Sequence, residues 1–112
     1  MKKKKAEEKI TTLEEGDLVG LVLRMMGGDW IEVFCDDEVV RKVRIPKSKR
    51  SIRIKPNDLI VIRPWYGIDE TRGDMITKLT PRDLKHLLKT ERGENIKKIL
   101  TEEQKEFYGI EE

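Results

Sequence analysis

Apolar residues between positions 16 and 80 fall into short runs that polar turns separate. The runs are rich in Val and Ile, and Gly, Asn and Asp cluster between them, a pattern that favours β-strands joined by tight turns. The predicted strands are residues 17–26, 30–35, 39–45, 59–63 and 75–79. The fourth run is the most apolar, so we expect that strand to be central and buried. Five short strands in this span indicate a small closed or partly open barrel.

Individual residues mark the turns and bends of this predicted barrel. Gly20 lies inside the first strand, where a glycine often marks a bulge or a tight bend. Pro46 ends the third strand, and the loop 47–51 leads to a brief extended piece at residues 52–54. The polar residues 69–74 predict a turn before the last strand.

Helix-start signals follow the last predicted strand. Thr80 suits an N-cap, Pro81 suits the first helical position, and Asp83 completes a capping pattern. Leucines then recur at i, i+3 and i+4, which forms one apolar stripe able to dock on the barrel. A second capping pattern begins at Thr101, and Gly109 can stop that helix. We therefore expect one or two short helices, the second loosely attached.

Length and composition limit the chain to one compact domain. It has 112 residues, of which 41% are charged and only 37% hydrophobic, so the core is small and any cleft is shallow. Such a domain fits a binding protein better than an enzyme with an enclosed pocket. The single cysteine cannot form an internal disulfide or a thiolate metal site, and no run is long enough to span a membrane. We expect a cytoplasmic protein that is not an enzyme, with no cofactor and no metal.

The near-neutral total of 24 basic and 22 acidic residues conceals a segregated distribution. Residues 1–15 hold five lysines and four glutamates with few apolar residues, which predicts a flexible basic tail. Residues 41–55 hold eight cations and no acid, whereas residues 91–112 hold seven glutamates against four cations. We therefore divide the chain into the tail (1–15), the barrel (16–80) and a helical segment with an acidic end (81–112).

Apolar residues alternate with cations in the basic stretch, at Val43, Ile45, Ile52 and Ile54. Alternation with a period of two places apolar side chains toward a core and basic ones on the opposite face. A solvated charged surface is the simpler interpretation. A face this dense in positive charge nevertheless attracts polyanions, because cations placed on phosphates release condensed counterions. A five-stranded barrel with a basic loop and a trailing helix describes an OB-fold, which predicts a nucleic-acid-binding domain.

Three segments carry motifs in a recognisable order: LVGLVLRMMGGDWIEVFCDDEVVRKVRIPKSKR, PNDLIVIRPW and GDMITKLTPRDLKHLL. Over roughly residues 16–90 they resemble the archaeal and eukaryotic translation initiation factor 1A family, an S1-like OB-fold. The residues that match the family pattern are Gly20, Gly27, Val33, Cys35, Arg44, Ile45, Pro46, Arg50, Asp58, Pro64, Trp65, Asp74, Ile76 and Thr80.

The resemblance implies a translation initiation factor that binds the decoding region of the small ribosomal subunit. Its partners would be ribosomal RNA and a ribosomal protein, with initiator tRNA and other initiation factors reached indirectly. We expect a monomer that neutralises RNA phosphates with basic side chains and uses one tryptophan as a stacking platform. The candidate RNA-binding residues are Trp30, Lys42, Arg44, Lys47, Lys49, Arg50 and Arg53.

The chain departs from the family pattern at three places. The basic loop is one residue shorter and lacks its glycine, Arg53 stands where the family usually has a tryptophan, and Trp30 stands where it usually has an arginine. If these two side chains lie near each other, the aromatic and cationic roles have been exchanged. A divergent paralogue with altered ribosomal contacts is also compatible with these departures.

Other candidate sites favour structural roles. His86, the only histidine, is expected on the surface or against the barrel, and Cys35 is expected to be a small buried hydrophobe. The consecutive acids of residues 36–38 alternate in direction, which favours a solvated turn over a metal site. Trp65 could stack on a base, but packing under the C-terminal helix is the favoured interpretation.

Two alternative functions remain open from the sequence. One is a generic single-stranded RNA-binding or chaperone protein of the cold-shock type, which would need more exposed aromatic residues than this chain offers. The other is a protein-interaction adaptor that works through the acidic end. Deletion of residues 101–112 would separate the adaptor from the RNA-binding functions.

Overall fold

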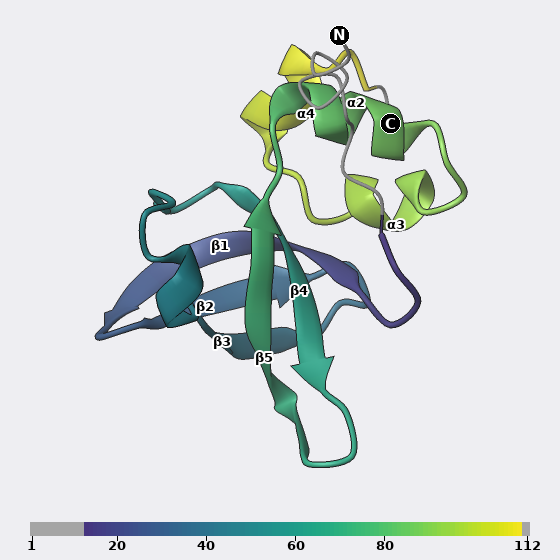
Figure 1. Cartoon of the computed structure of the whole chain (residues 1–112). Coiled ribbons are helices and arrows are strands. Elements are labelled where there is room, and N and C mark those ends of the chain that lie inside the picture. Colours follow the sequence, from purple (N-terminus) through teal and green to yellow (C-terminus); the bar gives the residue numbers. More distant parts are fainter. Residues whose placement is uncertain (1–12, 111–112) are drawn as a thin grey trace, which may run out of the picture.

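The computed structural model describes residues 13–110, which form a closed barrel with helices on one side (Figure 1). The strands are β1 (Leu18–Gly27), β2 (Trp30–Cys35), β3 (Val40–Arg44), β4 (Leu59–Trp65) and β5 (Asp69–Lys78). Their order around the barrel is β1-β2-β3-β5-β4, and β4 pairs with β1 to close it. All pairs are antiparallel except β3 with β5. The predicted five-stranded barrel with short C-terminal helices is confirmed.

The strand β4 is buried on both faces, as its continuous apolar run predicts. Ile60 and Ile62 point into the barrel, where they pack with residues such as Met75. Leu59 and Val61 point outward and pack against the helices. The barrel interior and the layer between barrel and helices are therefore two distinct apolar clusters that share one strand.

Gly20 allows β1 and β2 to approach closely, because a Cβ atom at this position would collide with the side chain of Val33. The irregularities of β1 come later in the strand, between Val22 and Arg24 and between Met25 and Gly27. Gly20 therefore serves the close packing of β1 against β2, and the strand irregularities lie further along β1 than this glycine.

The prediction of a turn at residues 69–74 is wrong. These residues begin β5, where Arg72 lies opposite Lys42 of β3 and Asp74 lies opposite Arg63 of β4. The sequence suggested a turn because the segment is polar and contains Gly73. In the barrel its polar side chains face outward, and a Cβ atom on that glycine would lie only 2.9 Å from the carbonyl oxygen of Arg63. The actual turn is the short connection 66–68.

Three helices follow the barrel in the described part of the chain: α2 (Pro81–Leu88), α3 (Gly93–Lys97) and α4 (Glu102–Phe107). The sequence anticipated α2 and α4 from their capping patterns and missed α3, which has no side-chain cap. Helix α4 itself buries no residue, as expected of a loosely attached helix, and its contacts with the rest of the fold are few. The Gln104 side-chain amide donates to the Asn57 carbonyl oxygen at 2.7 Å, and Tyr108 and Ile110 pack against the apolar layer.

The first turn of α2 is stabilised by reciprocal hydrogen bonds. The Asp83 backbone N–H donates to the Thr80 hydroxyl, and the Thr80 backbone N–H donates to the Asp83 carboxylate. We expect Thr80→Ala to lower the free energy of unfolding by about 0.5–2 kcal/mol, because it leaves a helix-start donor unsatisfied. Thr80→Ser should retain most of that stability in urea unfolding. Equal urea midpoints for Thr80→Ala and Thr80→Ser would contradict the role of the Thr80 hydroxyl as a helix cap.

An ion-pair network joins the helices to the barrel. The Arg92 guanidinium donates to the Asp36 carboxylate at 3.0 Å and to the Asp17 carbonyl oxygen at 3.1 Å. Asp17 in turn accepts from Arg63, which also pairs with Glu14. Leu13 packs against the apolar layer. The last residues of the predicted flexible tail therefore contact the barrel, and residues 1–12 lie outside the described residues, as do residues 111 and 112.

Candidate nucleic-acid interface

The outer surface formed by β2, β3 and β5 carries three of the seven predicted RNA-binding residues, Trp30, Lys42 and Arg44, and the other four lie in the segment between β3 and β4. On β3 the burial alternates, so Val43 points into the barrel while Lys42 and Arg44 point outward. Trp30 of β2 lies opposite Arg44, and Lys42 lies opposite Arg72 of β5. The helices do not share this surface, because they pack on the outward side of β1 and β4 (Figure 1).

Two tryptophans and three cations form one cluster on this surface, which we call the tryptophan cluster. The rings of Trp30 and Trp65 meet edge to face, with centroids 6.0 Å apart. The Lys42 ammonium lies 6.0 Å from the centroid of Trp30. Arg72 lies 5.6 Å from the same ring, and Arg44 lies 5.4 Å from the ring of Trp65. These distances are typical of cation–π contacts, so the cations are held against the rings and still reach solvent.

The position of Trp65 corrects the favoured interpretation of this residue. It does not pack under a C-terminal helix; it lies at the end of β4, half-exposed, against Trp30 and Arg44. The hairpin that follows it extends away from the helices (Figure 1). Packing under a helix was expected because helices follow soon after in the sequence, but β5 carries the chain back across the barrel before α2 begins.

The predicted cations divide into two groups by their partners. Arg44 pairs with Asp74 at 3.1 Å, and Arg50 pairs with Asp29 at 2.6 Å. Within residues 13–110, no acidic partner neutralises the remaining four candidates, which are Lys42, Lys47, Lys49 and Arg53. An unpaired cation can bind a phosphate without first losing an ion pair. The four unpaired side chains are therefore the better placed for phosphate contacts.

The basic loop begins as a single 3₁₀ turn, η1 (Lys47–Lys49), directly after Pro46. No residue of η1 is buried; Lys47 is exposed and Lys49 is partly exposed. The Arg50–Asp29 pair ties the end of the loop to the turn between β1 and β2. The loop cations are thereby held beside the end of β2 where Trp30 lies.

Arg41 does not belong to the basic surface, although it is one of the eight cations of residues 41–55. Its side chain is buried and pairs twice with Asp37, at 2.9 and 3.0 Å, and it also donates to the Glu70 carbonyl oxygen. The alternation explains this position, because Arg41 is in phase with the inward-facing Val43. The arginine thus connects β3 to the start of β5 and is unavailable to a ligand.

Trp30 and Arg53 have different neighbours. Trp30 belongs to the tryptophan cluster, whereas Arg53 lines a cavity with Lys55 and Lys78. No ring contact or ion pair joins the two among the described residues. The proposed exchange of aromatic and cationic roles between these positions therefore has no direct contact to support it.

Two residues of the tryptophan cluster, Arg72 and Trp65, were not among the RNA-binding residues predicted from the sequence. Arg72 was overlooked because its segment was interpreted as a turn, so its side chain had no predicted face. Recognising that residues 69–78 form one strand would have placed Arg72 and Asp74 on the same outward face by their spacing of two, whereas a register shift between Met75 and Thr77 breaks that alternation before Lys78. The pairing of Trp65 with Trp30 depends on barrel closure, which no local pattern encodes.

The remaining candidates have structural partners. Cys35 is buried, and burial raises the pKa of its thiol to about 11, which leaves the thiol protonated and unreactive at neutral pH. The acids of residues 36–38 diverge, toward Arg92, Arg41 and Lys98 respectively. Residues 13–110 contain no group of three His, Cys, Asp or Glu side chains that could hold a metal ion.

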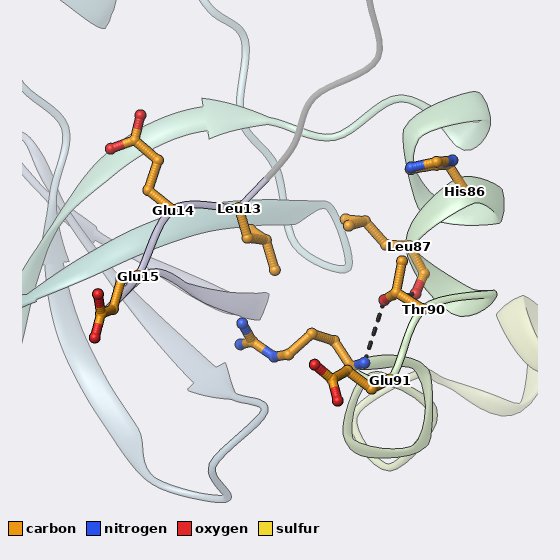
Figure 2. A pocket seen from close by; sticks show the side chains of 8 residues that line it. Leu13, Glu14, Glu15, His86, Leu87, Thr90 and Glu91 are labelled. Carbon is orange, nitrogen blue, oxygen red and sulfur yellow. Dashed lines mark hydrogen bonds between the residues drawn. The ribbon is translucent and has the colours of Figure 1, made fainter.

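A separate cavity lies between the segment before β1 and the end of α2 (Figure 2). Glu14, Glu15 and Glu91 supply three acids to its lining, and His86 is exposed at its edge. Within it, the Arg92 backbone N–H donates to the Thr90 hydroxyl. Because its lining is rich in acids, this cavity is poorly suited to a nucleic acid.

The fold defines the class of protein. A closed five-stranded barrel with these connections is an OB-fold, a class whose members bind oligonucleotides or oligosaccharides. Within that class, the chain belongs to the translation initiation factor 1A / IF-1 family, whose pattern it matches over residues 5–105. It is accordingly a non-enzymatic member of a translation initiation factor family.

Individual relatives agree with this assignment. The chain is 35% identical to translation initiation factor 1A of Pyrococcus abyssi (strain GE5 / Orsay) over 79 residues, which cover 69% of this chain and 70% of that protein. It is 33% identical to that of Picrophilus torridus over 92 residues, covering 81% and 84%. Among solved structures, a translation initiation factor from the Wolbachia endosymbiont of Brugia malayi aligns with a TM-score of 0.48 and 20% identity, over 61% of this chain and 86% of the other. No helix within residues 13–110 has the length and apolar character to cross a membrane.

Proposed function

We propose that the chain acts on the small ribosomal subunit, where it binds RNA of the decoding region and assists the placement of initiator tRNA. The observation that carries this proposal is the tryptophan cluster, in which two rings and three cations lie on a barrel surface that the helices leave open. Membership of the translation initiation factor 1A / IF-1 family supports the choice of the ribosome over other nucleic acids.

Two kinds of contact would contribute to binding. Lys42, Lys47 and Lys49, which have no acidic partner among the described residues, neutralise phosphates and release counterions. A base of the RNA stacks either on a tryptophan ring of the cluster or on the plane of one of its arginine guanidinium groups. Asp29 and Asp74 keep Arg50 and Arg44 oriented until a phosphate competes for them. Binding should therefore weaken steeply with salt.

The proposed partners are ribosomal RNA and a ribosomal protein, with initiator tRNA and other initiation factors reached through the subunit. The factor is proposed to bind as a monomer and without a cofactor. The acidic end of the chain would limit indiscriminate binding to polyanions, because its glutamates repel phosphates.

Co-sedimentation of the full chain with purified small and large ribosomal subunits, across a salt series, tests this proposal. We expect binding to the small subunit only, and a loss of binding as salt increases. A single-stranded RNA competitor in excess should displace little of the bound protein at moderate salt. Equal binding to both subunits, or complete displacement by any single strand, would favour a generic RNA-binding protein of the cold-shock type.

We expect Trp30→Ala to weaken small-subunit binding by about 1–3 kcal/mol, because it removes a stacking surface and releases Lys42 and Arg72 from the ring. Its effect should match that of Arg50→Ala. Trp30→Phe keeps an aromatic face and should retain most of the binding in the same co-sedimentation assay. If the Trp30→Ala protein binds the small subunit as tightly as wild type, Trp30 is not part of the interface.

A further inference from the structure

A second group of cations lies at the end of β5 that is remote from the tryptophan cluster. Arg53, Lys55 and Lys78 line a cavity of about 560 Å³ together with Ile54. Every charged side chain of this lining is positive. The cavity is therefore suited to an anion, and with one apolar side chain and no aromatic ring it is poorly suited to a base.

A single carboxylate positions two of these cations. Asp58 accepts from the Lys55 ammonium at 3.0 Å and pairs with the Lys78 ammonium at 3.3 Å. The Lys55 backbone N–H also donates to it at 2.9 Å, and only 9% of the Asp58 side chain is exposed. Burial tends to raise the pKa of Asp58, but the hydrogen bonds from Lys55 and Lys78 outweigh it and lower that pKa. Asp58 is thus ionised at neutral pH and holds the two ammonium groups near each other.

The anchored cations keep unused hydrogen-bond donors. The Lys78 ammonium also donates to the Arg53 carbonyl oxygen at 3.1 Å, so one of its three donors remains. Lys55 keeps two donors, and no partner occupies the Arg53 guanidinium within residues 13–110. Three positive charges against one negative charge leave a net charge of about +2 at the cavity.

We propose that this cavity is a phosphate-binding subsite for the backbone of a single RNA strand, a proposal that rests on the RNA-binding function above. Arg72 and Lys78 lie six residues apart along β5, roughly 20 Å at about 3.3 Å per residue, and a register shift between Met75 and Thr77 gives Lys78 the phase of the inward-facing Ile60, at the end of the barrel beside Asp58. The basic turn η1 lies against β5. An RNA strand that starts at the tryptophan cluster and follows β5 past η1 reaches the cavity, where a phosphate binds Arg53, Lys55 and Lys78.

The test uses Arg53→Gln/Lys55→Gln in the full chain, with Lys78 and Asp58 left intact to preserve their structural contacts. A fluorescent single-stranded RNA is titrated in anisotropy across a salt series. The variant should bind roughly tenfold more weakly at low salt, and the slope of log affinity against log salt should fall by about 1.4, or about 0.7 for each lost phosphate contact. The matched control is Lys85→Gln/Lys89→Gln, which removes the same charge from exposed positions on α2 and at its C-cap and should leave the slope unchanged.

Amide chemical shifts identify the ligand. RNA should shift the amides of residues 53–55 and 78, and inorganic phosphate at equal phosphate concentration and ionic strength should shift them much less. An unchanged slope for the cavity variant, or saturation by inorganic phosphate alone, would overturn the subsite. If wild-type protein binds the small subunit while the cavity variant retains full RNA affinity, only this subsite fails. If wild-type protein binds neither subunit, the proposed function fails as well.

Discussion

The double variant Lys47→Glu/Lys49→Glu is expected to lose small-subunit binding by a factor of roughly 100 or more at moderate salt. Lys47 is exposed and Lys49 is partly exposed on η1, and neither has an acidic partner among the described residues. Reversal of their charge removes two phosphate contacts and places two carboxylates where RNA phosphates would lie. The loop is exposed and contributes nothing to either apolar cluster, so the variant should unfold at the wild-type denaturant concentration.

The control for this variant is Lys85→Glu/Lys89→Glu, which changes the net charge by the same amount on α2. It should bind within roughly threefold of wild type, because long-range repulsion at moderate salt is screened over about 8–10 Å. The small-subunit affinity of Lys47→Gln/Lys49→Gln should lie between that of wild type and that of Lys47→Glu/Lys49→Glu. If both reversals weaken co-sedimentation equally, total charge rather than the loop determines binding, and the proposed interface is wrong.

The fold was largely predictable because the physical signals for it are local. Alternation on β3, the apolar run of β4 and the capping residues Thr80 and Thr101 each specify an element within a few residues of sequence. The failures arose where a local signal was absent or ambiguous. Helix α3 has no capping side chain, and residues 69–74 are polar because they face outward from a barrel rather than because they turn.

The candidate site was predictable only in part. The basic stretch identifies Lys42, Lys47 and Lys49, which have no acidic partner in the described part of the chain. The charge pattern alone could not tell that Arg41 is buried against Asp37, although its phase with Val43 contained that information.

Partners from distant parts of the chain were beyond local prediction. The contact of Trp65 with Trp30 joins residues that are 35 positions apart, and the pairing of Lys78 with Asp58 joins residues that are 20 positions apart. The sequence therefore indicated which residue types lie on the surface, whereas their pairing required the three-dimensional structure.

The substitution Ile62→Ala should cause the largest loss of stability among the variants considered. Ile62 is fully buried in the barrel interior, beside Ile60 and Met75. Its truncation leaves a cavity that rigid strands cannot close, and we expect the free energy of unfolding to fall by about 2–5 kcal/mol. Because domains of this size are stable by about 5–15 kcal/mol, urea unfolding should show a large shift in midpoint.

Ile62→Val provides a graded control and should cost about 0.5–1.5 kcal/mol. Below its own unfolding midpoint, Ile62→Ala should bind the small subunit as wild type does, because Ile62 points inward while the tryptophan cluster and η1 face outward. The effects on stability and on binding would then be separable: the interior sets whether the barrel forms, and the outer surface sets what it binds. A folded Ile62→Ala protein with weakened binding would instead indicate that the strands of the barrel shift when the interior is truncated, and that the geometry of the tryptophan cluster depends on interior packing.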